Sequence, residues 1–367
     1  MRKQIKKFTA IFLAVASFTL LLAGCKEEKL SVRALTPETG ESVSLVNEKM
    51  TQFAENYRFT GNSQGFARGE DYFAPVGVSL TWESTGEPTE YEIALATDET
   101  FTDAVSFITS ETSYTVEDLF VNSTYYWKIT ARKGAETQTS EVYSFQTKNT
   151  PRTIDIEGVS NTRDLGGKIT AEGKRVKQGI AFRGANLDTI TFKGMDDFKD
   201  RYGIKTDLDI REVDLGCSPL GASIQYINHS CPYYFGDEDG VDDPETHENL
   251  AAILREFADE ENYPIYLHCA VGRDRTGIVS MLLLGTLGVP QKTIMLDYET
   301  TAFSEIGTKG GALMQQLAIK MVGTIEYIKL EMQTEDLQAA CEKFLLQIGV
   351  TQEEIDSIKE ILLEEVA

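Results

Sequence analysis

The residues with the clearest capacity for chemistry are Cys269 and Arg275, which stand six positions apart in the stretch YPIYLHCAVGRDRTG. Nearby positive charge lowers the pKa of a cysteine thiol from about 8.5 into a range of about 3.5–7.5, where the thiolate nucleophile is present at neutral pH. A guanidinium can hold two oxygens of one phosphate in a planar geometry that lysine does not offer. The pair is therefore suited to nucleophilic attack on phosphorus, and Thr276 supplies a hydroxyl that can hydrogen-bond the sulfur.

A predicted strand over 264–267 and a predicted buried helix over 277–284 place this stretch between a strand end and a helix start. The first amide groups of a helix lack internal partners and lie at the positive end of its dipole, so a loop there can direct several N–H donors at one anion. Gly272 and Gly277 permit the tight path, and His268 is expected to orient the backbone around the thiolate. The predicted phosphate-binding residues are Ala270, Val271, Gly272, Arg273, Asp274, Arg275, Thr276 and Gly277.

The alternative is a structural cysteine beside a solvated cluster of charges, but an apolar strand does not need His-Cys at its end followed by Gly-Arg-Asp-Arg-Thr-Gly. The run HCAVGRDRTG resembles the signature of cysteine-dependent protein tyrosine phosphatases. More narrowly, it is similar to an atypical bacterial branch whose loop reads HCxxGKDRTG and whose members often accept phosphoinositides as well as phosphoproteins. Arg273 stands where that branch usually has Lys.

Two earlier segments extend the resemblance, which covers about 150–367. NTRDLGG at 161–167 and FRGANL at 182–187 are similar to the NxRDLGG and YRSxxL segments of the same branch. The resemblance implies an α/β domain with a central sheet and helices on both faces, and a phosphocysteine intermediate formed without a cofactor. Asp209 and Arg211 resemble its DLR strand, and we expect them either near the pocket or in an internal salt bridge.

The general acid is the least determined part of the predicted site. The sequence has no recognisable Trp-Pro-Asp loop, so Asp274 and the acidic segment from Asp237 to Asp243 are the two candidates. The acidic segment lies where many related phosphatases place their acid, but its several carboxylates would repel a phosphate dianion. Asp274 stands beside Arg275, and the resembling branch keeps Asp at this position. We therefore favour Asp274.

Residues 1–24 have the pattern of a targeting segment: a basic start, an apolar stretch, and Leu-Ala-Gly directly before Cys25. The apolar stretch is too short for a comfortable membrane span. Leu-Ala-Gly-Cys resembles the lipobox of bacterial lipoproteins, which implies that Cys25 is lipidated. We expect a lipoprotein of the cell membrane or outer membrane, outside the cytoplasm, with residues 25–34 as a linker. An ordinary signal peptide or an uncleaved anchor is the alternative.

Residues 35–149 have the pattern of an all-β sandwich. Three stretches, 76–82, 91–95 and 125–131, alternate apolar and polar residues at period two between turn-rich segments. The spacing around Tyr125 resembles that of fibronectin type III domains, which implies that Trp82 fills the core. We expect this domain to act as a spacer, to dock onto a partner or to contact carbohydrate. We also expect a short helix inserted near 48–57.

Charge and composition narrow the choice of partners. The chain has a net charge of −23, and removal of residues 1–24, which carry four basic and no acidic residues, leaves −27. Such a charge argues against nucleic acid and against binding to anionic membranes through a broad surface. The three histidines are scattered, and the acidic segment at Asp237 to Asp243 misses the spacing of a calcium loop, so we predict no metal.

Three cysteines remain after Cys25 and Cys269 are assigned. A bridge between Cys217 and Cys231 is conceivable outside the cytoplasm, but three small buried thiols, including Cys341, are the favoured interpretation.

For the substrate, we expect phosphotyrosine proteins first and phosphoinositides or inositol phosphates second. Arg273 beside Arg275 offers a second cation that would suit a doubly phosphorylated headgroup. A binding protein that only captures phosphorylated ligands is the rival class.

Overall fold

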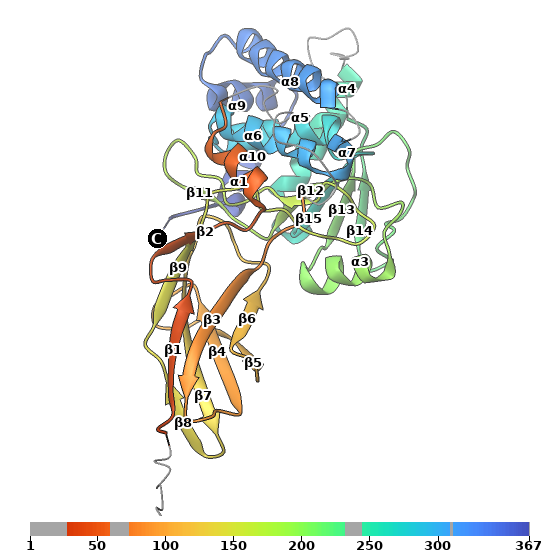
Figure 1. Cartoon of the computed structure of the whole chain (residues 1–367). Coiled ribbons are helices and arrows are strands. Elements are labelled where there is room, and N and C mark those ends of the chain that lie inside the picture. Colours follow the sequence, from red (N-terminus) through yellow and green to blue (C-terminus); the bar gives the residue numbers. More distant parts are fainter. Residues whose placement is uncertain (1–27, 59–72, 232–243, 309–310, 367) are drawn as a thin grey trace, which may run out of the picture.

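The computed structural model describes residues 28–58, 73–231, 244–308 and 311–366. An elongated β-rich part and a broader α/β part lie end to end (Figure 1). The β-rich part is a two-sheet sandwich. One sheet has the order β1-β3-β6, and the other has the order β2-β9-β7-β4-β5 with β8 paired to β7. The strands are β1 (Ser31–Thr36), β2 (Glu41–Val43), β3 (Val78–Thr85), β4 (Glu90–Ala96), β5 (Val105–Thr109), β6 (Ser113–Val116), β7 (Thr124–Lys133), β8 (Glu136–Thr139) and β9 (Tyr143–Thr147).

The period-two pattern of the sequence explains the sandwich core. In β7, alternate residues such as Trp127 and Ile129 are fully buried, and the residues between them are half-buried. Trp82 packs in the same core, with its ring centroid 5.3 Å from that of Tyr91. The hydroxyl of Tyr125 accepts a hydrogen bond from the backbone amide of Phe120 at 2.8 Å and so fixes the turn that precedes β7.

The chain leaves the sandwich between β2 and β3. Here α1 (Glu48–Glu55) begins at Asn47, whose side chain accepts a hydrogen bond from the Met50 amide at 3.0 Å. The predicted insertion is confirmed as a helix, but Met50, Phe53 and Tyr57 belong to the core of the α/β part. Figure 1 shows α1 among the helices of that part. Two expected boundaries therefore need correction, because 35–149 is not all sandwich and the expected linker at 25–34 overlaps β1.

A five-stranded sheet of order β10-β12-β15-β13-β14 forms the centre of the α/β part. The last four strands are parallel, whereas β10 runs antiparallel to β12. A separate two-stranded ladder joins β11 to β16 near the C-terminus. The strands are β10 (Arg163–Asp164), β11 (Arg175–Val176), β12 (Ala181–Gly184), β13 (Thr206–Asp209), β14 (Gln225–Asn228), β15 (Ile265–His268) and β16 (Leu363–Glu364).

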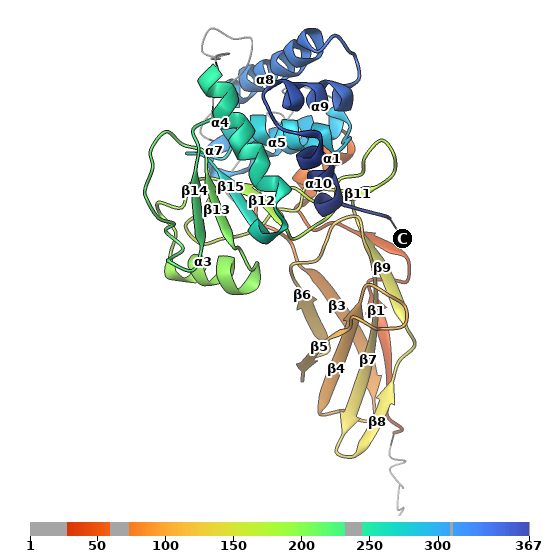
Figure 2. The same ribbon diagram turned by 180° about the vertical axis from the view of Figure 1, so that it is seen from behind.

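Helices cover both faces of this sheet, as predicted. One face packs on the larger core, to which most of the helices contribute, and α3 (Phe192–Asp196) covers the other face (Figure 2). Every residue of α5 is buried, which explains its nearly continuous apolar sequence. None of the helices in the described ranges combines the length and the apolar character needed to cross a membrane. The remaining helices are α4 (Pro244–Arg255), α5 (Asp274–Thr286), α6 (Gln291–Thr300), α7 (Glu305–Thr308), α8 (Gly311–Glu331), α9 (Leu337–Gln347) and α10 (Gln352–Leu362).

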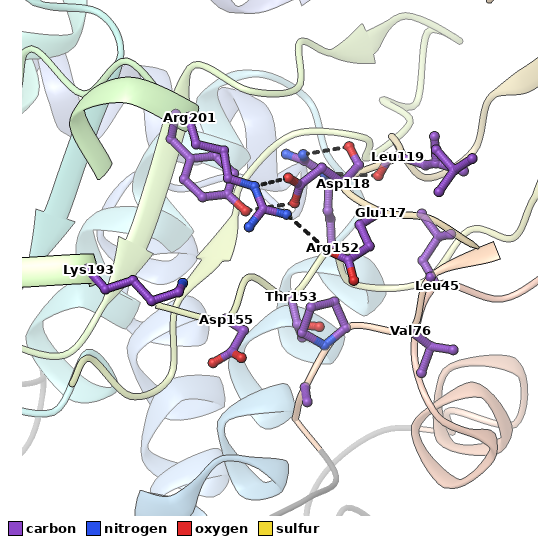
Figure 3. Close-up of a pocket in the computed structure, with 15 residues that line it drawn as sticks. Leu45, Val76, Glu117, Asp118, Leu119, Arg152, Thr153, Asp155, Lys193 and Arg201 are labelled. Atoms are coloured by element: carbon purple, nitrogen blue, oxygen red, sulfur yellow. Dashed lines mark hydrogen bonds and ion pairs between the residues drawn. The ribbon is translucent and has the colours of Figure 1, made fainter. Parts of the chain in front are cut away.

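The turn before β7 joins the sandwich to the α/β part. Val121 and Gln178 exchange two hydrogen bonds of 2.9 Å each. Arg152 donates to the backbone oxygens of Asp118 and Leu119, both at 3.1 Å. The carboxylate of Asp118 also pairs with Arg201, and these charged groups surround a cavity of about 240 Å³ at the junction (Figure 3). The two parts are thus joined by these hydrogen bonds and by α1, whose apolar side chains lie in the core of the α/β part.

Candidate active site

The stretch singled out in the sequence lies at the carboxyl ends of the parallel strands. Cys269 directly follows the central strand β15 and is only 3% exposed, while Asp274 and Arg275 begin α5. The strand register places Asp209 of β13 beside His268 of β15. Open α/β sheets bind ligands at this edge, outside the carboxyl ends of their strands. The predicted strand-loop-helix arrangement is therefore present.

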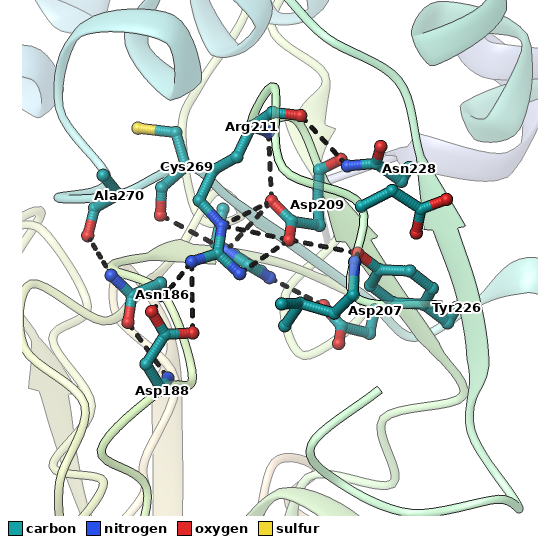
Figure 4. Close-up of polar contacts among 12 residues, drawn as sticks. Asn186, Asp188, Asp207, Asp209, Arg211, Tyr226, Asn228, Cys269 and Ala270 are labelled. Carbon is teal, nitrogen blue, oxygen red and sulfur yellow. Dashed lines mark hydrogen bonds and ion pairs between the residues drawn. The ribbon is translucent and has the colours of Figure 1, made fainter. Parts of the chain in front are cut away.

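Side chains from earlier segments hold the backbone oxygens of this loop. The amide nitrogen of the Asn186 side chain donates to the backbone oxygen of Ala270 at 2.8 Å (Figure 4). The Asn161 side chain donates to the backbone oxygens of Val271 and Gly272, both at 3.0 Å. In a trans peptide the C=O and the following N–H point in opposite directions. Carbonyls held on the outside therefore turn the next amides toward the space that the loop encloses.

Arg183 of β12 adds a further donor, because its Nη2 lies 2.9 Å from the backbone oxygen of Gly272. Its Nη1 pairs with Asp297 of α6 at 2.8 Å, and Arg163 and Lys168 each lie 3.3 Å from the other oxygen of that carboxylate. Burial by itself would raise the pKa of Asp297, but the three cations outweigh burial and hold that pKa well below its usual range. Burial lowers the pKa of Arg183 to about 10, so this guanidinium stays charged at neutral pH.

The two loop glycines are required for different reasons. Gly272 has a φ of +66°, and a Cβ there would lie 2.1 Å from the backbone oxygen of Gly184. Gly272 therefore permits the turn, as predicted. Gly277 lies inside α5, where a Cβ would meet the ring of Tyr298 at 2.8 Å. Gly277 therefore allows α5 and α6 to pack closely and is not needed for the path of the loop.

His268 connects the loop to the neighbouring strand. Its Nε2 lies 2.8 Å from a carboxylate oxygen of Asp207, and its Nδ1 lies 3.3 Å from the backbone oxygen of Cys269. Asp207 is held in turn by the hydroxyl of Ser218 at 2.7 Å. All of these side chains are buried. This geometry agrees with the expectation that His268 orients the backbone next to the cysteine.

Asp209 and Arg211 form an internal salt bridge, which was one of the two arrangements expected from the sequence. Arg211 makes three contacts of 2.8–3.0 Å with Asp209 and binds Asp188 at 2.9 Å with another nitrogen. Hydrogen bonding to Asp209 raises the pKa of the Arg211 guanidinium. Figure 4 shows Arg211 held between the two carboxylates. Its charge is therefore balanced within the protein.

The other two arginines near the loop also face carboxylates. Arg273 grips both oxygens of Asp274 at 2.9 and 3.0 Å. Arg275 Nη2 lies 2.8 Å from a carboxylate oxygen of Glu212, a side chain that is 70% exposed. Arg273 is expected to supply a second cation for a doubly phosphorylated group, and to do so it would have to leave the carboxylate of Asp274.

Two expectations about individual side chains are not met. The buried hydroxyl of Thr276 makes no hydrogen bond to any described residue, so the expected bond to the sulfur is missing. Cys217 is exposed, whereas Cys231 and Cys341 are buried, and no disulfide joins Cys217 to Cys231. Burial raises the pKa of Cys341 to about 12.

Within the described ranges, no group of three or more His, Cys, Asp or Glu side chains is arranged to hold a metal ion.

Comparison with known proteins identifies the family. The family described as "Tyrosine phosphatase family" matches residues 154–232 and 236–364, which is more than half of the chain. The chain belongs to this family. The matched residues include the whole stretch from Cys269 to Arg275.

Curated relatives carry the same description. A Cupriavidus necator protein that bears the name of a tyrosine-protein phosphatase is 29% identical over 168 residues, covering 40% of this chain and 61% of its own length. A tyrosine-protein phosphatase of Nostoc commune is 28% identical over 81 residues, which is 22% of each chain. The chain thus spans less than two thirds of the length of either relative. Among solved structures, the core catalytic domain of the PP-IP phosphatase SIW14 from S. cerevisiae matches with 15% identity and a TM-score of 0.29, covering 47% of this chain and 95% of that one.

The candidate site also includes residues that sequence reasoning did not single out. Asn161, Arg183 and Asn186 hold the loop carbonyls, and Glu212 faces Arg275. The first three lie in the NTRDLGG and FRGANL segments, so their position in those segments was an available signal. Nothing in the sequence distinguished Glu212 from other surface carboxylates. The candidate acids from Asp237 to Asp243 and the candidate lipid site at Cys25 lie outside the described residues.

Proposed function

We propose that the protein is a phosphatase that works through a phosphocysteine. The Cys269 thiolate attacks phosphorus while the bond to the leaving oxygen breaks, and an acid protonates that oxygen. Water then attacks phosphorus and releases inorganic phosphate and the thiolate. Arg275 and the loop amides bind the phosphoryl oxygens in both steps. The observation that carries this proposal is that donors from Asn161, Arg183 and Asn186 hold the loop carbonyls.

Asp274 is the proposed general acid. It begins α5 next to Arg275 and is 9% exposed. A general acid must carry a proton and reach the leaving oxygen. Because Arg273 occupies both carboxylate oxygens, proton delivery requires this pair to open. An arriving phosphate dianion can open it by attracting Arg273 away from Asp274.

Phosphotyrosine proteins are the proposed substrates. The supporting observation is that Arg211, Arg273 and Arg275 each have a carboxylate partner within the protein. A singly phosphorylated side chain needs to displace only the partners of Arg273 and Arg275, which are Asp274 and Glu212, whereas a polyphosphorylated inositol needs an excess of cations around the site. Phosphoinositides or inositol phosphates are the second candidate. Capture of a phosphorylated ligand without turnover is the candidate of another class.

We also propose that the phosphatase is exported and lipid-anchored through Cys25. The strand β1 begins at the end of the sandwich that lies far from the α/β part (Figures 1 and 2). An anchor attached ahead of β1 would hold the catalytic part away from the membrane by the length of the sandwich. The sandwich, which we propose to be a fibronectin type III domain, would then act as a spacer. Membrane fractionation of wild type and Cys25→Ser tests the anchor, and recovery of wild type in the soluble fraction contradicts it.

One set of assays tests the proposed chemistry and substrate. Turnover of p-nitrophenyl phosphate separates an enzyme from a phosphate-binding protein. Cys269→Ser should abolish turnover and retain binding of a phosphopeptide, because only the nucleophile is lost, and wild-type activity should survive EDTA. Residual kcat within about tenfold of wild type would exclude the covalent mechanism, since nucleophile removal in such systems costs far more.

The substrate class is decided by kcat/KM on phosphotyrosine peptides and on phosphoinositide vesicles, measured at the same salt concentration. We expect the peptides to be better substrates, because the strongly acidic chain is repelled by anionic bilayers. A preference of about tenfold or more for the vesicles would reverse the order of the two candidates.

A further inference from the structure

A groove of about 640 Å³ begins at the outer wall of the phosphate loop, where Ala270 and Val271 line it. Asn186 lies at this edge and holds the backbone oxygen of Ala270 (Figure 4). The other walls come from separate segments of the chain, at 73–74, 154–161 and 304–306. A substrate whose phosphate lies in the loop would therefore place its neighbouring groups over this groove.

The wall formed by 154–161 is held rigidly. The amide of Val159 donates to the backbone oxygen of Ile156 at 2.9 Å and closes a turn around Glu157 and Gly158. The backbone oxygen of Gly158 accepts from the hydroxyl of Thr189 at 2.8 Å. The side chain of Glu157 thus projects from a turn whose backbone is already fixed, so a bound ligand would not have to order it.

The charged residues among the described lining of the groove are all acidic. Asp155 and Glu157 are exposed, and Glu305 adds a third carboxylate. The described lining residues include no Lys or Arg. Asp155 and Glu157 form no ion pair with any described residue. Asp155 also lines the neighbouring cavity together with Arg152 and Lys193, but Arg152 pairs with Asp164 at 2.8 Å and Lys193 with Asp197 at 2.6 Å. The groove lining also includes apolar side chains such as Ile156 and Val159.

We propose that this groove binds the peptide segment that flanks the phosphotyrosine of a protein substrate and selects for Lys or Arg in that segment. The inference rests on the proposed phosphotyrosine activity. Basic side chains would approach Asp155 and Glu157 while the phosphate stays in the loop. A further phosphate would meet the same carboxylates and be repelled, so the groove disfavours inositol polyphosphates.

The test compares two phosphotyrosine peptides of equal length, one with Lys and one with Glu at the flanking positions. The full chain, its Asp155→Asn/Glu157→Gln variant and a matched control are assayed for kcat/KM at low and high salt. The control, Glu111→Gln/Glu136→Gln, removes two exposed charges from the sandwich instead. Wild type and control should prefer the Lys peptide by roughly three- to tenfold, and the groove variant should lose most of that preference. High salt should reduce the preference.

The assays distinguish a failure of the groove inference from a failure of the proposed phosphotyrosine activity. p-Nitrophenyl phosphate reaches only the loop, so its turnover should be the same in all three proteins and reports an intact fold. Peptide turnover without a charge preference, or a preference that the groove variant retains, overturns the groove inference and leaves the phosphotyrosine activity standing. Turnover of inositol phosphates with none of either peptide overturns both.

Discussion

At the scale of single residues, side-chain hydrogen bonds to backbone oxygens hold the loop that we propose to bind phosphate. Asn161, Arg183 and Asn186 each donate to the loop, and the first two are almost fully buried. Donors fixed before substrate arrives stabilise developing negative charge without reorganisation during the reaction. The charged side chains of the loop are less free, because both Arg273 and Arg275 contact carboxylates that a phosphate must displace or share.

Asp274→Asn tests the proposed acid. General acids contribute about 10²–10⁴-fold, and the need for them grows with the basicity of the leaving group. The variant should therefore slow hydrolysis of phosphotyrosine strongly and that of a dinitrophenyl-type ester much less, as measured by kcat on both esters. Equal slowing of both esters, together with leaving-group dependence in Asp237→Asn, would assign the acid to the segment from Asp237 to Asp243.

Glu212→Gln tests the contact with Arg275. An amide competes less well than a carboxylate for a guanidinium, so inorganic phosphate should inhibit the variant more strongly, by roughly two- to fivefold in Ki. Asp214→Asn is the matched control. Asp214 is also exposed, and this substitution removes the same charge two positions away from Glu212. Weaker inhibition of the Glu212 variant would instead show that this carboxylate positions Arg275.

At the scale of elements, one buried carboxylate fastens several segments below the loop. Asp297 of α6 meets Arg163 of β10, Arg183 of β12 and Lys168 from the segment between β10 and β11. Arg183 then reaches from this cluster to the backbone oxygen of Gly272. The position of the proposed phosphate loop therefore depends on a buried ion cluster on α6 and the neighbouring strands.

Asp297→Asn should destabilise the protein by about 3–5 kcal/mol at pH 7, because it leaves buried cations without their anion. The pKa of Asp297 is lowered in the folded state. Its contribution is therefore fully present above the unfolded-state pKa of about 4 and is lost as the pH falls toward the folded value. Urea unfolding should show a shallower loss of stability below pH 4 in the variant than in wild type. Equal stability of the two proteins at pH 7 would show that the cluster contributes little.

At the scale of the whole molecule, the sandwich is built into the α/β part. Phe53 of α1 packs against Phe303, with ring centroids 5.1 Å apart, and the Tyr57 hydroxyl donates to Glu299 at 2.7 Å. Glu299 is fully buried on α6, the same helix that carries Asp297. Loss of α1 would therefore uncover part of the core on which α6 packs.

Phe53→Ala therefore tests whether the N-terminal part stabilises catalysis. Truncation of a buried Phe costs about 3–5 kcal/mol, which corresponds to about 4–7 °C in a protein of this size. The temperature at which p-nitrophenyl phosphatase activity is lost should fall by about that amount. Ile108→Ala is the control, because Ile108 lies on the sandwich surface and is 65% exposed. If Phe53→Ala behaves like this control, the catalytic part is stable without α1.

The sequence by itself was sufficient to predict those features that depend only on residues close together in the chain. The strand ending at His268, the glycine at 272 and the buried helix after Arg275 are local patterns, and all three are present in the structure. The alternation of β7 and the helix near 48–55 are local in the same sense. Period, capping and turn residues determine such elements within a few residues of each other.

Only the tertiary structure decided which distant residues meet. It placed Asn161, Arg183 and Asn186 against a loop about 100 residues away, as their separations of 110, 89 and 84 residues show. It put α1 into the core of the α/β part and Glu212 against Arg275. Hydrogen bonds and ion pairs across such separations depend on how the whole sheet and its helices pack, because no local period or spacing in the chain records which side chains will be brought together.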